Sequence, residues 1–256
     1  MRFDIENFRL DGKVAVVTGA GAGIGRAIAE LFASAGASVM VSDLDAGAAV
    51  AVSEAIGAAG GNAAATGCNV TEEADLVMLV NRAAEEFGGV DVLVNNAGGG
   101  GPKPFDMPMS DFEWAYRLNV FAAFRLTQLC AAQMARRGGG AVLNISSMAG
   151  ENANSRMASY ASSKAAVNHL TRNIAFDLGP MGIRVNAIAP GAIKTHALST
   201  VLTPEIERHM LAKTPLARLG EPGDIAHAAL FLCAPASAWV SGQVLTVSGG
   251  GVQELD

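Results

Sequence analysis

Cysteine is scarce in this sequence, and long apolar runs are missing. The three cysteines (Cys68, Cys130 and Cys233) are widely spaced, odd in number and without a CxxC pair. That arrangement argues against a disulfide framework and against a zinc site, and it suits a reducing compartment. The N-terminus has no apolar signal core, and no run of about 18 uncharged apolar residues follows it. We therefore expect a cytoplasmic protein with no bound metal and no membrane segment.

Charged residues are also few, at 16% of the 256 residues, with a net charge of −6 at pH 7 and no basic run. Nucleic acid and anionic membrane surfaces are therefore not expected as partners. Half of the residues are hydrophobic, which is enough for a sizeable core and too many for a disordered chain. Length alone leaves open one large domain or two small ones.

Glycine, by contrast, is abundant, and it first gathers after a predicted strand. Lys13–Thr18 is a continuous apolar run, typical of a strand buried on both faces, and it leads into TGAGAGIG at 18–25 and a helical pattern. Glycines let the backbone approach a pyrophosphate, and the free N–H groups of a helix N-terminus favour an anion. The spacing is not GxGxxG, and a purely structural turn is the alternative. The pattern predicts a phosphate-binding turn.

An acidic residue, Asp43, ends the second predicted strand at 37–42. Its carboxylate can accept hydrogen bonds from the ribose hydroxyls of an adenosine, and it would repel a 2′-phosphate. No Arg or Lys occupies the glycine turn or residues 41–48. The sequence therefore predicts NAD rather than NADP as cofactor. The compatible structural role is that of an N-cap for the helix that begins near residue 45.

Seven predicted strands alternate with about six helices, and no long linker separates them. The strands are expected at 13–18, 37–42, 63–68, 90–94, 141–147, 183–188 and 243–247. Right-handed crossovers between such strands build one parallel sheet with helices on both faces. We predict an α/β fold with a single doubly wound, Rossmann-like domain over residues 1–256. Ligands of such folds bind at the carboxyl edge of the sheet.

Two segments depart from this regular alternation. A long helix is predicted at 108–137, and its apolar stretch contains Asn119, which we expect to kink the helix or to hold a water. The residues after Thr195, to about 214, form a polar stretch that we expect to be mobile. Within it, 197–212 is the part that we expect to cover the substrate.

Tyr160 and Lys164 stand four residues apart in YASSK, so on a helix they share one face with Cβ atoms roughly 6 Å apart. A neighbouring cation favours the phenolate and lowers a tyrosine pKa from its ordinary value of about 10. The pair can therefore serve as a general acid and base, and Ser147 upstream can hold a carbonyl or alcohol oxygen. An amphipathic helix with a surface Tyr and Lys is the alternative, because YxxxK also arises by chance.

The motifs together resemble the short-chain dehydrogenase/reductase family over essentially the whole chain. The ordered set is TGAGAGIG at 18–25, Asp43, NNAG at 95–98, Asn119, Ser147, YASSK at 160–164, and Pro190-Gly191 with Thr195. The resemblance implies that Tyr160 is the general acid and base and that Lys164 lowers its pKa and holds the nicotinamide ribose. It implies that Ser147 orients the substrate oxygen and that Asn119 supports a water chain to Lys164.

The resemblance also implies which residues contact NAD. Members of the family commonly have Asp near the adenine, where this chain has Asn69. An amide still donates and accepts hydrogen bonds, so we expect cofactor binding to survive. The implied cofactor contacts are Gly19, Gly23, Ile24, Gly25, Asp43, Asn69, Val70, Asn96, Tyr160, Lys164, Ile193 and Thr195.

The loops resemble those of the bacterial hydroxysteroid dehydrogenases in this family, which use NAD and act on bile acids. The similar stretches are NNAGGGGPKPFDMPM at 95–109, APGAI at 189–193 and TPEIE at 203–207. They imply oxidation of the 7α-hydroxyl group of a bile acid or steroid by a homotetramer. The residues implied to line the substrate site are Gly100, Ser147, Asn152 and Tyr160.

Two alternatives stay open. The same chemistry could act on a 3-oxoacyl thioester or on a sugar or polyol. A carrier-protein partner usually needs a basic patch, and only Arg156 and Lys194 stand out nearby, while Asp43 disfavours NADPH. The second alternative is a non-catalytic NAD-binding sensor or scaffold. Such proteins usually lose Tyr or Lys of the pair, and both are present here.

Overall fold

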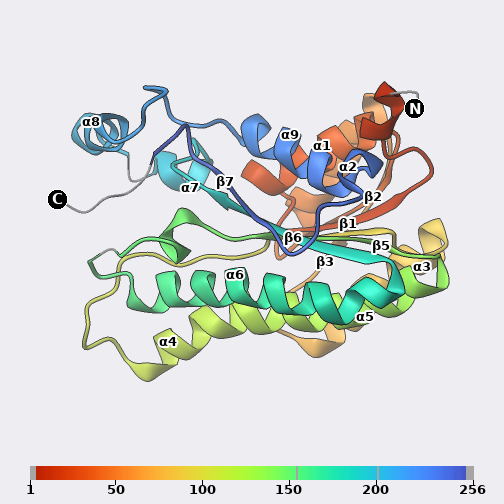
Figure 1. The fold of residues 1–256 in the computed structure, drawn as a ribbon, viewed down its shortest axis with the longest axis horizontal. Coiled ribbons are helices and arrows are strands. Elements are labelled where there is room, and N and C mark those ends of the chain that lie inside the picture. Colours follow the sequence, from red (N-terminus) through yellow and green to blue (C-terminus); the bar gives the residue numbers. More distant parts are fainter. Residues whose placement is uncertain (1–3, 154, 201, 252–256) are drawn as a thin grey trace.

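Seven parallel strands form one sheet in the computed structural model, in the order β3-β2-β1-β4-β5-β6-β7 (Figure 1). The structure describes residues 4–153, 155–200 and 202–251. The strands are β1 (Val14–Thr18), β2 (Ser38–Asp43), β3 (Asn62–Gly67), β4 (Val92–Asn95), β5 (Gly140–Ile145), β6 (Ile183–Pro190) and β7 (Val244–Val247). This confirms the predicted doubly wound α/β fold. The strand order reverses at β1, between β2 and β4, where such sheets bind their ligands.

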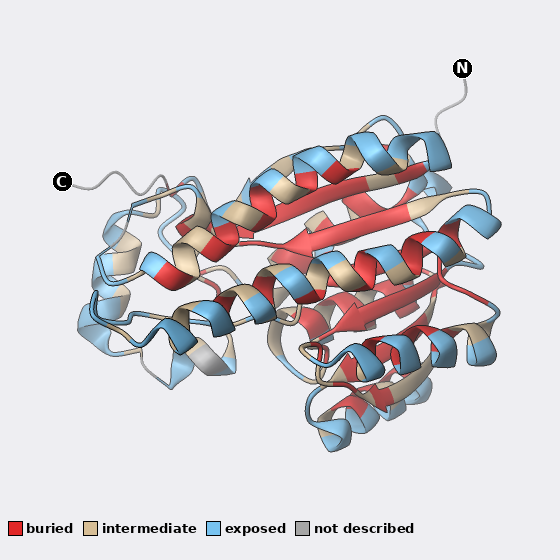
Figure 2. Ribbon diagram, turned by 90° about the horizontal axis from the view of Figure 1, so that it is seen from below, coloured by how far each residue is buried: buried red, intermediate tan, exposed pale blue. Residues whose placement is uncertain are grey.

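The central strands are apolar on both sides, so the sheet has to be covered on both faces. Every residue of β1 and of β4 is buried. Aliphatic side chains on both faces of a parallel strand leave neither face to water. Figure 2 shows these strands as buried and the surrounding helices as exposed on their outer sides.

Helices cover the two faces as separate layers. The helices are α1 (Gly23–Ser34), α2 (Ala46–Ala58), α3 (Glu73–Phe87), α4 (Met109–Tyr116), α5 (Ala122–Arg136), α6 (Ala158–Leu178), α7 (His196–Ser199), α8 (Pro204–Ala212) and α9 (Pro222–Cys233). One face carries α1, α2 and α9 around a core that contains Phe32 and Ile225. The other carries α3, α5 and α6 around Leu79 and Met134.

Short 3-10 turns occur at four places in the described ranges, and they connect or precede the larger elements. They are Ile5–Phe8, Met148–Gly150, Gly179–Met181 and Pro235–Ser237. The turn Met148–Gly150 matters for the site because it follows β5 directly and leads toward α6.

The predicted long helix at 108–137 is divided by a π-helical segment. Arg117–Phe121 separates α4 from α5, and Asn119 lies in its middle, buried with an exposed fraction of 3%. A π-bulge widens the helix by one residue and is frequent at functional sites. The helix predicted at 108–137 is therefore interrupted at Asn119 by a wider, π-helical turn.

The segment after Thr195 contains two helices, which the prediction of a polar, mobile stretch missed. Thr203 caps α8, because its side-chain oxygen accepts from the backbone N–H of Ile206 at 3.2 Å, and Pro204 occupies the first helical position. Both helices lie beyond the carboxyl ends of the strands (Figure 1). Val201, within the stretch expected to cover the substrate, lies outside the described residues.

Candidate active site

The carboxyl ends of β1, β4 and β5 carry most of the polar residues that the sequence singled out. The glycine turn follows β1, Asn96 follows β4, and Ser147 follows β5. Parallel strands end at the same edge of the sheet, so these segments meet although they are far apart in sequence.

The turn after β1 is built around backbone conformations that glycine adopts without strain. Gly19 has φ +61° and Gly23 has φ +57°. A Cβ on Gly25 would overlap the carbonyl oxygen of Gly19, so this position excludes any larger residue. The Asn96 side chain donates to the carbonyls of Thr18 and Gly19, each at 2.9 Å, and fixes the turn against the end of β4.

The N-terminus of α1 fits a pyrophosphate. Its N-cap is Ala22, which supplies no side-chain cap, so the first amide groups of the helix remain free for an anion. Thr195 lies across the turn, since its Cγ2 would be 3.4 Å from a Cβ on Gly23. Ile24 packs, partly buried, against the core behind the turn, and Ile193 is buried below Thr195.

Asp43 lies beside the same turn. One carboxylate oxygen accepts from the N–H of Gly21 at 2.8 Å, and the other accepts from the N–H of Asp45 at 3.0 Å. The suggested N-cap role for Asp43 is wrong, because Asp45 caps α2 by accepting from Gly47 and Ala48. The carboxylate of Asp43 is thus held at the turn where an adenosine ribose would lie.

Asn69 and Val70 follow β3 at the outer end of this edge. The Asn69 side-chain oxygen accepts from the backbone N–H of Thr71 at 3.1 Å and from its hydroxyl at 2.8 Å. The Asn69 backbone N–H donates to Asp75 at 2.8 Å, and Val70 is buried. The amide oxygen therefore serves the local turn, and the amide nitrogen is the part of this side chain left for a ligand.

Helix α6 brings Tyr160 and Lys164 under the end of β5. Lys164 is 4% exposed as a residue, and its ammonium donates to the carbonyl oxygen of Ile145 at 2.9 Å and lies 5.8 Å from the centre of the Tyr160 ring. The hydroxyl of Ser147 favours the ionised form of the Tyr160 phenol and lowers its pKa. The structure thus brings together the three residues that the sequence proposed for the chemistry.

Asn119 reaches this group from the π-helical segment. Its amide nitrogen donates to the carbonyl of Gly99 at 2.9 Å and to the hydroxyl of Ser163 at 3.0 Å. Its amide oxygen accepts from the N–H of Gly99 at 3.0 Å. A Cβ on Gly98 would contact both the Asn119 oxygen and the Lys164 nitrogen, at 2.8 and 3.1 Å. Asn119 therefore holds the segment after β4 over Lys164.

Gly100 packs against the Tyr160 side chain, and Asn152 follows the 3-10 turn after β5. Gly100 has φ +143°, and a Cβ there would come within 2.5 Å of the Tyr160 ring, so only glycine lets the backbone lie against the phenol. The amide nitrogen of Asn152 is buried and has no hydrogen-bond partner in the part of the chain that the structure describes. A buried donor without a partner is rare, and this N–H group is able to donate to an oxygen atom of a ligand.

Comparison with known proteins places this site in a family. A family model described as enoyl-(acyl carrier protein) reductase matches residues 19–251. The 7α-hydroxysteroid dehydrogenase of Escherichia coli strain K12 is 63% identical over 254 residues, which are 99% of this chain and 100% of that protein. This chain belongs to the short-chain dehydrogenase/reductase family.

A second relative and a solved structure also match nearly the whole chain. The 3-oxoacyl-[acyl-carrier-protein] reductase of Vibrio cholerae is 38% identical over 243 residues, 94% of this chain and 98% of that protein. A structure of 7α-hydroxysteroid dehydrogenase complexed with NADH and 7-oxo glycochenodeoxycholic acid has a TM-score of 0.97, 63% identity and complete coverage of both chains.

Several contacts of this short-chain dehydrogenase/reductase site were not predicted from the sequence. They involve the carbonyl of Ile145, the backbone of Gly99 and the hydroxyl of Ser163. Backbone groups leave no mark in the residue type, so Ile145 and Gly99 gave no signal. Ser163, three residues after Tyr160 on the same helix, could have been found from its position on the helix face.

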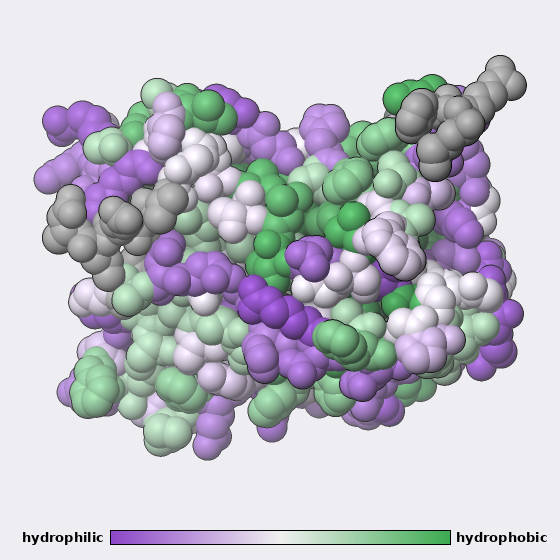
Figure 3. Space-filling view, viewed as in Figure 1, coloured by the Kyte–Doolittle hydropathy of each residue, from purple (hydrophilic) through white to green (hydrophobic). Residues whose placement is uncertain are grey.

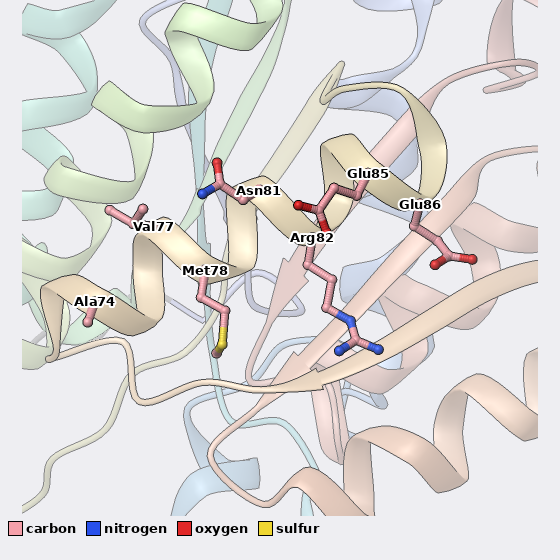
Figure 4. A pocket seen from close by; sticks show the side chains of 7 residues that line it. All are labelled: Ala74, Val77, Met78, Asn81, Arg82, Glu85 and Glu86. Atoms are coloured by element: carbon pink, nitrogen blue, oxygen red, sulfur yellow. The ribbon is translucent and has the colours of Figure 1, made fainter.

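One pocket lies away from these residues. The pocket in Figure 4 is lined by side chains of α3 alone, among them Val77, Met78 and Arg82, and it holds none of the residues above. Within the described residues no group of three His, Cys, Asp or Glu side chains could hold a metal ion. No helix among them is long and apolar enough to cross a membrane.

Burial dominates the acid–base properties of the pair. It raises the pKa of Tyr160 above its ordinary value, and the hydrogen bond with Ser147 acts in the opposite direction. It lowers the pKa of Lys164 to about 8. The predicted lowering of the Tyr160 pKa is therefore wrong for the chain by itself. The loss of hydration on burial outweighs the effect of Ser147 on the Tyr160 pKa, and burial also disfavours the charge of Lys164.

The buried ammonium predicts a pH-dependent stability. The pKa of Lys164 is about 8 in the folded chain, against 10.5 for an unperturbed lysine. Between these values the unfolded chain binds more protons, so the contribution of Lys164 to the free energy of unfolding rises with pH. We expect the free energy of unfolding of wild type, minus that of Lys164→Met, to rise by up to about 3 kcal/mol as the pH increases over this range.

Urea unfolding of both proteins on either side of this pH range measures that difference. Titrations of other groups are common to both proteins and cancel. A difference that stays constant across the range would contradict the burial of a charged Lys164.

Proposed function

We propose that this chain transfers hydride reversibly between carbon 7 of a bile acid and NAD, oxidising the 7α-hydroxyl group to a ketone. The observation that carries the proposal is the full-length similarity to a 7α-hydroxysteroid dehydrogenase, 63% identical, whose structure holds NADH and 7-oxo glycochenodeoxycholic acid. Similarity of this extent includes the loops over the site as well as the residues that the family shares.

The residues at the sheet edge fit NAD. The uncapped N-terminus of α1 and the glycine turn suit the pyrophosphate, and the carboxylate of Asp43 at Gly21 suits a free ribose and repels a 2′-phosphate. Arg26, the nearest cation after the turn, is paired with Glu30 at 2.7 Å. The bound cofactor supplies the hydride acceptor and a positive ring next to the phenol.

Tyr160 is proposed as the group that takes the hydroxyl proton, with Lys164 supporting its phenolate. Ser147 accepts a hydrogen bond from the N–H of Ala149 at 3.1 Å. Its own hydroxyl, which favours the Tyr160 phenolate in the chain by itself, can donate its hydrogen to the substrate oxygen. Donors of this kind stabilise the developing alkoxide and are commonly worth about 3 kcal/mol. The proton then leaves through a water chain that Asn119 supports beside Lys164.

Two described residues favour a substrate with a polar group beyond the reacting hydroxyl. Gly100 lets the segment after β4 lie directly against the Tyr160 ring, and the unpartnered amide of Asn152 can donate to a substrate oxygen. The helices α7 and α8 extend over this edge of the sheet, and we propose that they cover the bound substrate.

Other substrates are the second candidate. Reduction of a 3-oxoacyl thioester has a specific argument in its favour, the 38% identity with the Vibrio cholerae reductase. The higher identity with the hydroxysteroid enzyme and the acidic Asp43 both favour the bile acid and NAD. A sensor or scaffold without catalysis is disfavoured by the complete set Tyr160, Lys164 and Ser147.

A substrate panel tests the proposal. With NAD we expect oxidation of cholic and chenodeoxycholic acids and none of ursodeoxycholic acid, the 7β epimer, measured as NADH absorbance. NADP should support less than a tenth of the rate because Asp43 repels its phosphate.

Tyr160→Phe should lower turnover more than about a thousandfold, in the range of a lost general base, while NADH binding measured by fluorescence stays nearly unchanged. Activity on none of the three acids would contradict the substrate, and a tenth of wild-type activity in Tyr160→Phe would contradict the role of the phenol.

We further propose a cytoplasmic homotetramer. The three cysteines are free and buried, which suits a reducing compartment. Phe121 and Phe124 expose 60% and 40% of their surface on the π-helical segment and α5, and Leu245 exposes 38% on the edge strand β7. Apolar side chains also gather on the face of the molecule drawn in Figure 3. Two self-complementary surfaces are what a tetramer with three two-fold axes needs. Sedimentation equilibrium should give four times the chain mass, and a monomer at micromolar concentration would contradict the assembly.

A further inference from the structure

Arg156 has a backbone conformation that an arginine adopts only at a cost. Its φ is +63°, and Ala217 is the other residue besides glycine with positive φ in the described part of the chain. Side chains crowd the backbone in this region, and glycine is the residue that occupies it freely. A strained residue that is not glycine is a reason to ask what its side chain does.

The strained turn lies at the mouth of the proposed site. The backbone N–H of Lys103 donates to the carbonyl of Arg156 at 2.7 Å, and this bond ties the segment after β4 to the one before α6. The first of these segments lays Gly100 against the Tyr160 ring, and the second carries Asn152. Arg156 therefore belongs to the frame of the same opening.

The guanidinium of Arg156 is exposed and, among the described residues, has neither a hydrogen bond nor an ion pair. Nearby charged residues, by contrast, have partners. Lys103 pairs with Asp111 at 2.9 Å. Glu151 accepts a hydrogen bond from Asn168 at 2.7 Å and lies 4.0 Å from Arg172. The arginine thus presents an uncompensated cation at the opening. Lys194, on the segment after β6, is also exposed and is the alternative residue for binding an anion.

The chemistry of the substrate supplies a matching group. A bile acid is an apolar ring system with an anionic side chain at one end, far from the 7-hydroxyl. Apolar surface for the rings is present on the same segment, where Phe105 is 97% exposed and Met109 is 66% exposed. A guanidinium pairs with a carboxylate through two parallel hydrogen bonds.

We infer that Arg156 is a specificity-determining residue, which pairs with the anionic side-chain terminus of the bile acid while the 7-hydroxyl lies at Tyr160. The inference rests on the proposed function. Arg156 is placed to act on binding of the anion and has no part in the hydride step. Its effect therefore belongs in the KM of anionic substrates and not in kcat.

The test compares glycochenodeoxycholic acid with its neutral methyl ester, below the concentrations at which they form micelles. In Arg156→Gly and Arg156→Gln we expect the KM of the acid to rise about threefold to tenfold, as for one partly solvated ion pair, with kcat unchanged. The KM of the ester should not change. Added salt should raise the KM of the acid in wild type and have less effect in either variant.

A matched control separates the side chain from the backbone. Arg156→Gly removes the strain, so its melting temperature should equal or exceed that of wild type. Ala217→Gly gives the same relief at the other strained residue, and it should leave both KM values unchanged. Arg156→Gln keeps the strained backbone and loses only the charge, so agreement between the two Arg156 variants assigns the effect to the guanidinium.

Each remaining outcome overturns the inference. An equal change for acid and ester, or no change for either, would mean that Arg156 does not recognise the anion. A loss of preference for the acid in Lys194→Gln but in neither Arg156 variant would assign the contact to Lys194. If wild type oxidises both the acid and the ester but the Arg156 variants do not raise the KM of the acid, the inference about Arg156 fails and the proposed function stands. If wild type oxidises neither compound, the inference and the proposed function both fail.

Discussion

The site depends on one buried ammonium. Lys164 lies at 4% exposure under the end of β5, and its charge is held by the carbonyl of Ile145. Burying an unpaired charge is costly, so the surroundings have to be ordered around it. The hydroxyl of Ser146 donates to the Lys164 carbonyl, and Gly150 lets the turn after β5 pack against the backbone of α6. These contacts fix the position of Tyr160 relative to Ser147.

The same burial limits what the chain can do without its cofactor. The Tyr160 phenol is desolvated, so its pKa is raised, and Lys164 does not offset this. A further positive charge close to the ring would favour the phenolate, and an oxidised nicotinamide carries one. On this account proton removal from the substrate depends on NAD as well as on the residue pair. Binding of NAD then itself lowers the pKa of Tyr160 and prepares it to act as a base.

The sequence alone was enough for the sheet, because strand periodicity and turn residues are local signals and parallel strands share an edge. The positions of Ser147, Tyr160 and Lys164 followed from that topology. Other features depend on contacts between distant segments, which residue types do not reveal. In the π-helical turn the amide of Asn119 meets the backbone of Gly99, and the positive φ of Arg156 accompanies its bond with Lys103. The direction of the Tyr160 pKa shift required the burial of the pair, which spacing could not give.

The most direct measurement is the titration of Tyr160 itself. The chain has two tyrosines, and Tyr116 stacks on Phe112 at 5.3 Å, where a phenylalanine can replace it. In Tyr116→Phe the ultraviolet absorbance of phenolate reports Tyr160 alone. We predict a Tyr160 pKa above its ordinary value of 10 in the protein without ligand, and a lower pKa when NAD is added. A pKa below 10 without NAD, or one that NAD does not move, would contradict the account.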